Sequence, residues 1–180
     1  QECDRLTKEF PQSFLLWNLL GAAFQSQGKF EEAIAAYNKA LLIKPEYADA
    51  HYNMGAVFQA QGKFDEAIAA YNKALLIKPD YAKAHNNIGN ALTAQGKFEE
   101  AIAAFNNGLL IKPDYAEAHY NMGNALRDQG KLDEAIAAYN KALLIKPDYV
   151  DAYNNMGNAL TDQGRRDEAI AAYNKALLIK

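Results

Sequence analysis

The sequence predicts an all-α solenoid of antiparallel helix hairpins, because it repeats at a fixed interval and every repeat carries two helical segments. All five prolines recur 34 residues apart, as Pro11, Pro45, Pro79, Pro113 and Pro147. Ten of the eleven glycines form two further series at the same interval, one from Gly21 to Gly157 and one from Gly28 to Gly164. A fixed period of this size is typical of solenoids, in which each repeat stacks on its neighbours.

Counting positions from Phe14 divides most of the chain into five repeats: 14–47, 48–81, 82–115, 116–149 and 150–180. The fifth repeat stops at position 31, just before its expected proline. Residues 1–13 continue the count backwards, with Pro11 at the proline position, and we interpret them as the remnant of a preceding repeat helix. We therefore expect the chain to be cut from a longer array, or to begin and end inside one.

Each repeat is predicted to form a first helix, helix A, and a second helix, helix B. Aspartate at position 33, such as Asp114, is expected to cap the next helix A, and Glu117 completes a capping box. Helix A then runs to the glycine at position 15, which supplies the left-handed turn that follows many helices. Helix B begins with acidic residues, carries lysine in its last turn as the helix dipole favours, and ends before the proline.

The first repeat carries a recognisable series of large and small residues: Trp17, Leu20, Gly21, Phe24, Ala33, Tyr37, Ala40 and Pro45. They match the tetratricopeptide pattern W-x2-L-G-x2-Y…A-x3-F…P, and later repeats keep its glycine, alanine and proline. The chain therefore resembles a tetratricopeptide repeat (TPR) protein over essentially all of residues 14–180. The resemblance implies a right-handed superhelical solenoid in which helices A line a concave groove.

At about 100° per residue, helix A divides into two faces. Positions 3, 4, 7, 8, 10 and 11 are mostly apolar or small and form the predicted packing face. Positions 2, 5, 6, 9, 12 and 13 are mostly polar and are expected to point away from the packing. Histidine recurs at position 4 as His51, His85 and His119. Equivalent positions of successive repeats lie too far apart to share one zinc ion, so we expect packing histidines and no metal site.

Asparagine recurs on the face of helix A that is predicted to be free. It occupies position 6 as Asn53, Asn87, Asn121 and Asn155, which we call the asparagine ladder, and position 9 as Asn90, Asn124 and Asn158. An amide donates and accepts, so it can pair with a peptide group without reading a side chain. Packed helices lie roughly 8–10 Å apart and an extended peptide rises about 3.3 Å per residue, so the ladder can hold a strand-like peptide at about every third residue.

Motifs such as HYNMGNAL are very similar to those of the O-linked N-acetylglucosamine transferase array, whose asparagine ladder lies along the inner groove. The match falls on position 6 of the second to fifth repeats, whereas the first repeat departs from it with Leu19. An alternative remains open: the repeated asparagines reflect duplication of one ancestral repeat, with water or hydrogen bonds inside the array satisfying the amides.

These features together predict a non-catalytic scaffold for protein–protein interaction, which binds an extended peptide segment along the concave face and needs no cofactor. The asparagine ladder is expected to hold the peptide backbone, the asparagines at position 9 to support it, and Tyr52 and Tyr120 at position 5 to add apolar contact. Two alternatives remain open. One is a self-assembly module, a homo-oligomer that stacks end to end through uncapped repeats. The other is the recruitment arm of a larger enzyme such as a glycosyltransferase.

A stripe of leucines runs along helix B at position 29: Leu42, Leu76, Leu110, Leu144 and Leu178. The sequence does not decide between single surface leucines, which are common, and a lateral contact surface for self-association.

Composition excludes several other classes. The net charge of −3 argues against nonspecific binding to nucleic acid, and no apolar run approaches the roughly 20 residues of a membrane helix. A single cysteine, Cys3, allows neither an internal disulfide nor a cysteine cluster for zinc. There is no phosphate-binding glycine loop, and with serine only at Ser13 and Ser26 no Ser-His-Asp set is suggested. We therefore expect no enzymatic activity, no contact with a membrane, and a cytoplasmic location.

Overall fold

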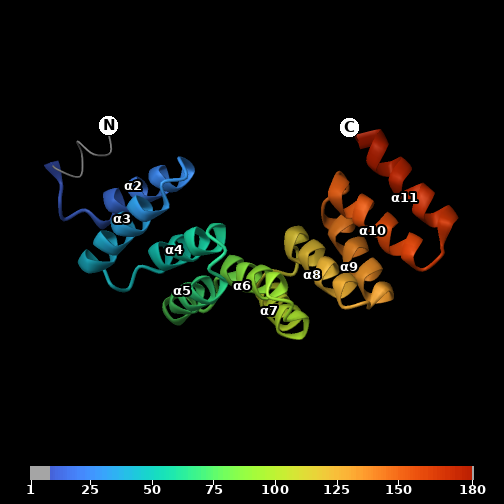
Figure 1. Cartoon of the computed structure of the whole chain (residues 1–180), viewed down its shortest axis with the longest axis horizontal. Coiled ribbons are helices and arrows are strands. Elements are labelled where there is room, and N and C mark those ends of the chain that lie inside the picture. Colours follow the sequence, from blue (N-terminus) through green and yellow to red (C-terminus); the bar gives the residue numbers. More distant parts are fainter. Residues whose placement is uncertain (1–8, 180) are drawn as a thin grey trace. The chain divides into compact units, whose positions relative to one another are not determined.

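The computed structural model describes residues 9–179, and this part of the chain is built from ten α-helices without any β-strand. The helices are α2 (Phe14–Ser26), α3 (Phe30–Ile43), α4 (Ala48–Ala60), α5 (Phe64–Ile77), α6 (Ala82–Ala94), α7 (Phe98–Ile111), α8 (Ala116–Asp128), α9 (Leu132–Ile145), α10 (Val150–Asp162) and α11 (Arg166–Ile179) (Figure 1). The predicted all-α fold is confirmed. Of the predicted remnant at the start of the chain, residues 1–8 lie outside the described residues.

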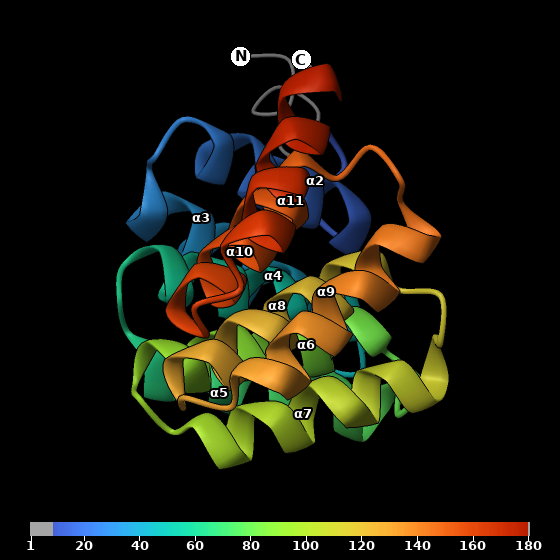
Figure 2. The same cartoon turned by 90° about the vertical axis from the view of Figure 1, so that its right-hand side faces the viewer.

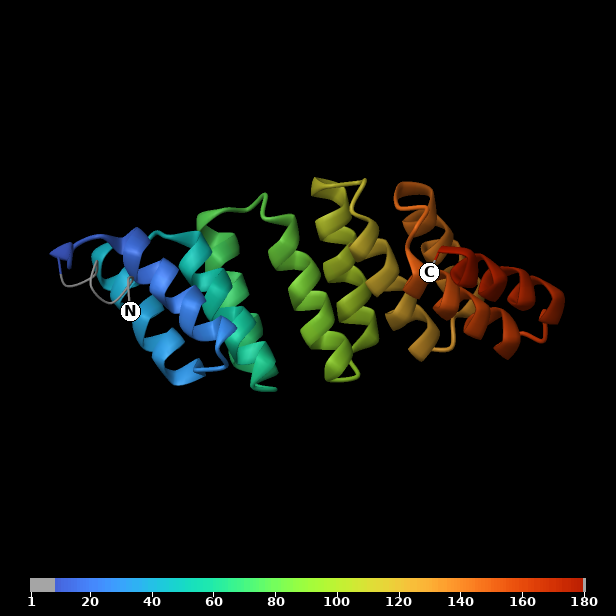
Figure 3. The same ribbon diagram turned by 90° about the horizontal axis from the view of Figure 1, so that it is seen from above.

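The chain forms two compact units, and the boundary between them falls inside α6. The N-terminal unit ends at Asn87, and the C-terminal unit begins at Ile88. In the N-terminal unit α2 pairs with α3 and α4 with α5, while in the C-terminal unit α8 pairs with α9 and α10 with α11. Figures 2 and 3 show the two helices of each hairpin running side by side in opposite directions. Each of these hairpins falls within one predicted repeat.

The glycine at position 15 ends helix A, as predicted. Its φ lies in the left-handed region in every repeat: Gly28 71°, Gly62 73°, Gly96 74°, Gly130 83° and Gly164 76°. At the end of α4 the amide of Gly62 donates to the carbonyl of Gln59 at 3.0 Å, and the amide of Lys63 donates to that of Phe58 at 2.9 Å. These two bonds form a Schellman motif, whose left-handed residue is usually glycine.

The glycine at position 8 of helix A lies directly against an aromatic ring of helix B. A Cβ added to Gly55 would lie 2.6 Å from Cε1 of Tyr71, and one added to Gly123 would lie 2.5 Å from Cε1 of Tyr139. The rings at this position of helix B are accordingly fully buried: Tyr37, Tyr71, Phe105 and Tyr139. Position 8 thus lies on the packing face, as predicted, and helices A and B approach each other closely there.

Position 4 of helix A anchors the chain that leads into the helix. In α2 the indole nitrogen of Trp17 donates to the carbonyl of Pro11 at 2.9 Å. In α8 the corresponding His119 places Nε2 3.1 Å from the carbonyl of Pro113, and 8% of this histidine is exposed. His119 thus packs as predicted, at the position where the first repeat uses tryptophan, and His51 and His85 are half-buried there.

The predicted aspartate caps are wrong. The N-cap of α8 is Tyr115 rather than Asp114, and no side chain caps the helix. The aspartate lies two residues before the first helical residue, so its carboxylate is out of register with the free amides of the first turn. Asp148 uses its backbone instead, since its carbonyl accepts from the amide of Val150 at 3.0 Å.

Candidate functional site

The residues predicted to bind a peptide lie on one face of the first helix of each hairpin. In each unit we call this face the amide face, and it is formed by repeat positions 5, 6 and 9 of those helices among α4, α6, α8 and α10 that belong to the unit. Most of the predicted residues are half-buried there: Asn53, Asn87, Asn121 and Asn155 of the ladder, Asn90 and Asn124 at position 9, and Tyr52 and Tyr120 at position 5. Asn158 is exposed.

The expectation that this face points away from the packing is wrong in part. Asn86, at position 5 of α6, is 0% exposed. Nδ2 of Asn53 donates to Oδ1 of Asn18, 35 residues earlier, at 3.1 Å. Helix A of an internal repeat packs against the repeat before it and the repeat after it, whereas a division into one polar and one apolar face assumes that only one side of the helix is packed. Side chains at positions 5 and 6 therefore contact the neighbouring helix A.

In the N-terminal unit the amide of Asn87 is engaged by its neighbours. Its Nδ2 donates to the hydroxyl oxygens of Tyr52 at 3.1 Å and Tyr71 at 3.3 Å, while its Oδ1 accepts from Asn86 at 3.3 Å. The Tyr71 hydroxyl group in turn donates to Oε1 of Gln59 at 2.9 Å. Because a side-chain amide has two N–H hydrogens, Asn87 has no donor left for a ligand.

In the C-terminal unit, tyrosine hydroxyl groups orient two of the amides at position 9. Oδ1 of Asn124 accepts from the hydroxyl group of Tyr139 at 2.8 Å and from Nδ2 of Asn155 at 2.8 Å. Oδ1 of Asn158 accepts from the hydroxyl group of Tyr173 at 2.8 Å. Since the oxygen of each amide is held, its Nδ2 points the other way, and neither Nδ2 has a hydrogen-bond partner within residues 9–179.

Asn155 has the opposite arrangement. Its Nδ2 donates to the hydroxyl oxygen of Tyr120 at 3.0 Å and to Oδ1 of Asn124 at 2.8 Å, which uses both of its hydrogens. Its Oδ1 has no partner in the described part of the chain. The amide face of the C-terminal unit therefore presents N–H donors at Asn124 and Asn158 and a carbonyl acceptor at Asn155.

Burial keeps the tyrosines of this face protonated. It raises the pKa of Tyr139 far above its ordinary value, so the hydroxyl group remains a donor to Asn124 well into alkaline solution. It also raises the pKa of Tyr149 to about 12. The ring of Tyr120 lies 4.9 Å from that of Tyr149, and the ring of Tyr52 stacks on that of Tyr81 at 4.9 Å. The tyrosines at position 5 thus pack within the array as well as bordering the face.

The N-terminal unit has a hollow on its amide face. It has a volume of about 330 Å³ and is lined by Ala56, Gln59, Ala60, Tyr71 and Asn87. Ala56 stands at position 9, where the later repeats carry asparagine, so the smaller side chain leaves this space open.

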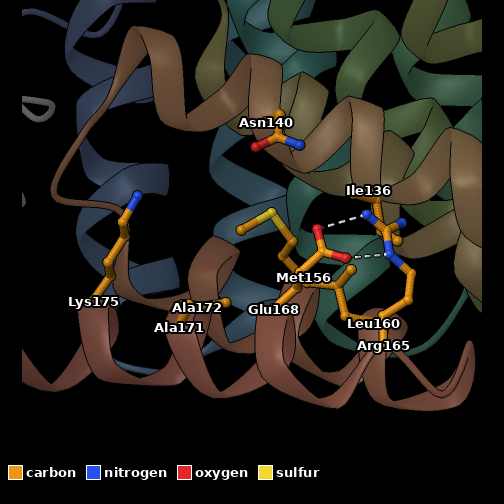
Figure 4. Close-up of a pocket in the computed structure, with 9 residues that line it drawn as sticks. All are labelled: Ile136, Asn140, Met156, Leu160, Arg165, Glu168, Ala171, Ala172 and Lys175. Atoms are coloured by element: carbon orange, nitrogen blue, oxygen red, sulfur yellow. Dashed lines mark hydrogen bonds and ion pairs between the residues drawn. The ribbon is translucent and has the colours of Figure 1, made fainter.

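A second hollow, away from the amide face, lies between α9, α10 and α11 and has a volume of about 230 Å³. In Figure 4, Met156 and Leu160 of α10 lie between Ile136 of α9 and the side chains of α11. At one end Arg165 forms an ion pair with Glu168 at 2.7 Å. None of the predicted binding residues lines it, and the alanines of helix B gave no sign of it in the sequence.

The tyrosine hydroxyl groups that form part of this site were not among the residues predicted from the sequence. The sequence contains an indication of their role, because the residue types at positions 9 and 12 of helix A vary together. Where position 9 is alanine, position 12 is glutamine and accepts from the tyrosine: Gln25 from Tyr37 at 2.9 Å, and Gln59 from Tyr71. Where position 9 is asparagine, position 12 is threonine or arginine.

Within residues 9–179, no group of three or more histidine, cysteine, aspartate or glutamate side chains is placed to hold a metal ion. No helix in that range is long and apolar enough to cross a membrane. Cys3 lies outside the described residues.

Family models for tetratricopeptide repeats match more than half of the chain. One, described as TPR repeat, matches residues 21–62, 89–127 and 123–164. Two described as Tetratricopeptide repeat match residues 48–81 and 150–180, and residues 70–103. Repeats of this family mediate protein–protein interaction and are typically non-catalytic scaffolds.

Among curated proteins, the chain is similar to the peroxisomal targeting signal receptor of Kluyveromyces lactis. The two are 44% identical over 54 residues, which is 29% of this chain and 10% of that receptor. The receptor of Saccharomyces cerevisiae is 46% identical over 44 residues, which is 24% of this chain and 7% of that receptor. The matched segments thus span a tenth or less of the length of these relatives.

Among solved structures, the crystal structure of MamA is 31% identical with a TM-score of 0.80, and the match covers 89% of this chain and 94% of that one. The crystal structure of YrrB, described as a TPR protein with an unusual peptide-binding site, is 23% identical with a TM-score of 0.74. That match covers 100% of this chain and 93% of YrrB, and at this identity it shows a likeness of fold alone.

Proposed function

Because the chain belongs to the tetratricopeptide repeat family, whose repeats mediate protein–protein interaction, we propose that it binds an extended peptide segment along the amide face. The observation that carries the proposal is the pairing of donors and an acceptor in the C-terminal unit. Asn124 and Asn158 present N–H groups, and Asn155 presents a carbonyl oxygen. A peptide bond offers the complementary pair, a C=O acceptor and an N–H donor.

In this proposal the two asparagine positions have different tasks. The asparagines at position 9 donate to peptide carbonyls, since their oxygens are already held by tyrosine hydroxyl groups. The asparagine ladder binds through its oxygens, as at Asn155, and its amide hydrogens hold neighbouring helices A together. Tyr52 and Tyr120 border the peptide and supply apolar contact. The ladder members Asn53 and Asn121 act in the same way within their own units, whereas Asn87 contributes through its neighbours, since both its hydrogens and its oxygen are in use.

The test is a peptide-display selection against the chain, followed by measurement of Kd for the selected peptides. The test variant removes the donors while keeping the tyrosines satisfied. It combines Asn124→Ala with Arg127→Gln and Asn158→Ala with Thr161→Gln, because Ala56 and Gln59 show that alanine at position 9 is compatible with a glutamine acceptor at position 12. We expect peptide binding to weaken at least tenfold, about 1.4 kcal/mol.

The matched control removes two exposed amides from helices B, through Asn72→Ala and Asn174→Ala, and should leave Kd within twofold. Circular dichroism should show the same helix content for all three proteins. If the parent selects no peptide, or if the test variant binds as tightly as the parent, the proposal is wrong.

A second candidate is end-to-end self-association through α11. Ile170 and Leu177 of this helix are 57% and 69% exposed, whereas Ile136 and Leu143, at the same repeat positions of α9, are each 8% exposed. Apolar surface of this kind favours stacking against a second copy. Light scattering over a concentration series tests this candidate. The molecular mass of the parent should rise with protein concentration, whereas that of Ile170→Glu should stay at the value of the monomer.

A further inference from the structure

The amide of Asn90 differs from the other two asparagines at position 9 of the C-terminal unit. Asn124 and Asn158 each accept a hydrogen bond from a tyrosine hydroxyl group. Asn90 is half-buried on α6 and has no hydrogen-bond partner within the described residues. The difference follows from the facing residue of helix B, which is Phe105 in this repeat.

The phenylalanine ring occupies the same place as the tyrosine rings. A Cβ added to Gly89 would lie 2.6 Å from Cε1 of Phe105, and one added to Gly157 would lie 2.5 Å from Cε1 of Tyr173. Phe105 is also fully buried. Phe105 therefore differs from the tyrosines of the other repeats only in lacking the hydroxyl group, and this is the group that would hold Oδ1 of Asn90.

The fifth repeat provides a matched comparison within the chain. It shares asparagine at position 9 and threonine at position 12 with the third repeat. Oγ1 of Thr93 donates to the carbonyl of Gly89 at 2.8 Å, and Oγ1 of Thr161 donates to that of Gly157 at 2.8 Å. Both threonines thus donate to the carbonyl of the glycine at position 8, and Oγ1 of Thr161 lies in addition 3.4 Å from the hydroxyl oxygen of Tyr173. This further contact also depends on the tyrosine hydroxyl group, so the ring of helix B is what distinguishes the surroundings of Asn90 from those of Asn158.

From this geometry we infer that Phe105 is a specificity-determining residue, which leaves the amide of Asn90 free to turn toward a ligand. An amide whose oxygen is held offers only N–H donors, whereas one that can rotate offers a donor or an acceptor. Asn124 and Asn158 thus require an acceptor on the peptide, such as a backbone carbonyl. Asn90 pairs with either a carbonyl or an N–H group, so the array tolerates a wider range of peptide registers at the third repeat. This inference rests on the proposed function.

The first test follows the amide in the free protein, so it does not depend on peptide binding. Side-chain ¹⁵N relaxation should give a lower order parameter for Asn90 than for Asn158. The variant Phe105→Tyr supplies the missing hydroxyl group and should raise the order parameter of Asn90 to that of Asn158. The reverse variant, Tyr173→Phe, should lower the order parameter of Asn158. If Asn90 is as rigid as Asn158 in the parent protein, the inference is overturned.

The second test measures Kd for the selected peptides. Phe105→Tyr should change Kd at least threefold, with gains for peptides that accept from Asn90 and losses for those that donate to it. Tyr37→Phe is the control, because its repeat has Leu19 and Ala22 instead of asparagine at positions 6 and 9, and it should leave Kd within twofold. If the Kd values of the parent and of Phe105→Tyr agree within twofold for every selected peptide, the inference is overturned. A parent that binds no peptide refutes the proposed function, and the relaxation measurement still decides the state of Asn90.

Discussion

The two compact units bury the same tyrosine ring but give its hydroxyl group different acceptors. In the N-terminal unit Tyr71 donates to Gln59 at position 12 of helix A, at 2.9 Å. In the C-terminal unit Tyr139 donates to Asn124 at position 9, at 2.8 Å. Positions 9 and 12 are one turn apart, so one hydroxyl group reaches either.

The comparison separates what the fold requires from what the surface is free to vary. The contact between the glycine at position 8 and the ring of helix B is the same in both units. The amide face differs, with a hollow beside Ala56 in the N-terminal unit and an oriented amide at Asn124 in the C-terminal unit. Two kinds of amide face thus arise from one packing arrangement, according to which residue accepts from the tyrosine hydroxyl group.

The largest effect should come from the contact that the two units share. Gly55→Ala and Gly123→Ala each place a methyl group within 3 Å of a buried ring. Overpacking of this kind costs about 2–3 kcal/mol, and the helix propensity of alanine returns at most about 1 kcal/mol. Urea denaturation should show a lower free energy of unfolding for both variants, by similar amounts. Equal stability of parent and variants would contradict the account of position 8.

A smaller effect should follow from removing the acceptor of the tyrosine. Gln59→Ala leaves the hydroxyl group of Tyr71 without the amide oxygen that it donates to, and the free energy of unfolding should fall by about 1 kcal/mol. Adding Ala56→Asn to this variant moves the acceptor to position 9, as in the C-terminal unit, and should restore most of the loss. Thermal unfolding followed by circular dichroism measures both steps, and absence of rescue would show that the two arrangements are not interchangeable.

The histidines should make the stability of both units depend on pH. Burial lowers the pKa of His51 and His85 in the N-terminal unit and of His119 in the C-terminal unit below the ordinary 6.5. The unfolded chain therefore binds protons more readily, and the free energy of unfolding should fall as the pH drops from about 7 to 5. Tyr153 holds position 4 in α10, so His51→Tyr and His119→Tyr should each reduce this slope. An unchanged slope in both would show that other groups cause it.

The smallest effect should come from the leucine stripe of helix B. Leu76 and Leu144, one in each unit, are 84% and 83% exposed. Leu76→Gln and Leu144→Gln should change the free energy of unfolding by less than about 0.5 kcal/mol, as is usual for surface positions. A lower molecular mass of either variant in light scattering would reveal the stripe as a contact surface.

Local features of the fold were predictable because they depend on residues close in sequence. The left-handed turn at Gly62 and the tight contact at Gly55 follow from glycine and its period. The prediction of the aspartate caps was wrong, because helix A begins one residue later than the capping pattern requires. At the site, the positions of the asparagines on helix A were predictable, but their orientation was not. It depends on partners such as Tyr120, 35 residues from Asn155, and on which oxygen a buried hydroxyl group reaches.

The buried tyrosine rings also give the chain an intrinsic optical reporter in alkaline solution. Burial raises the pKa of Tyr37 to about 12 from its ordinary 10.0, and it raises that of Tyr71 and Tyr139 as well. The folded chain holds these protons more tightly than the unfolded chain, so their contribution to stability is complete below pH 10 and is lost as the pH rises through 12 and above. Phenolate absorbance from these rings should therefore appear together with the loss of helix, so a single ultraviolet titration records unfolding without an added dye.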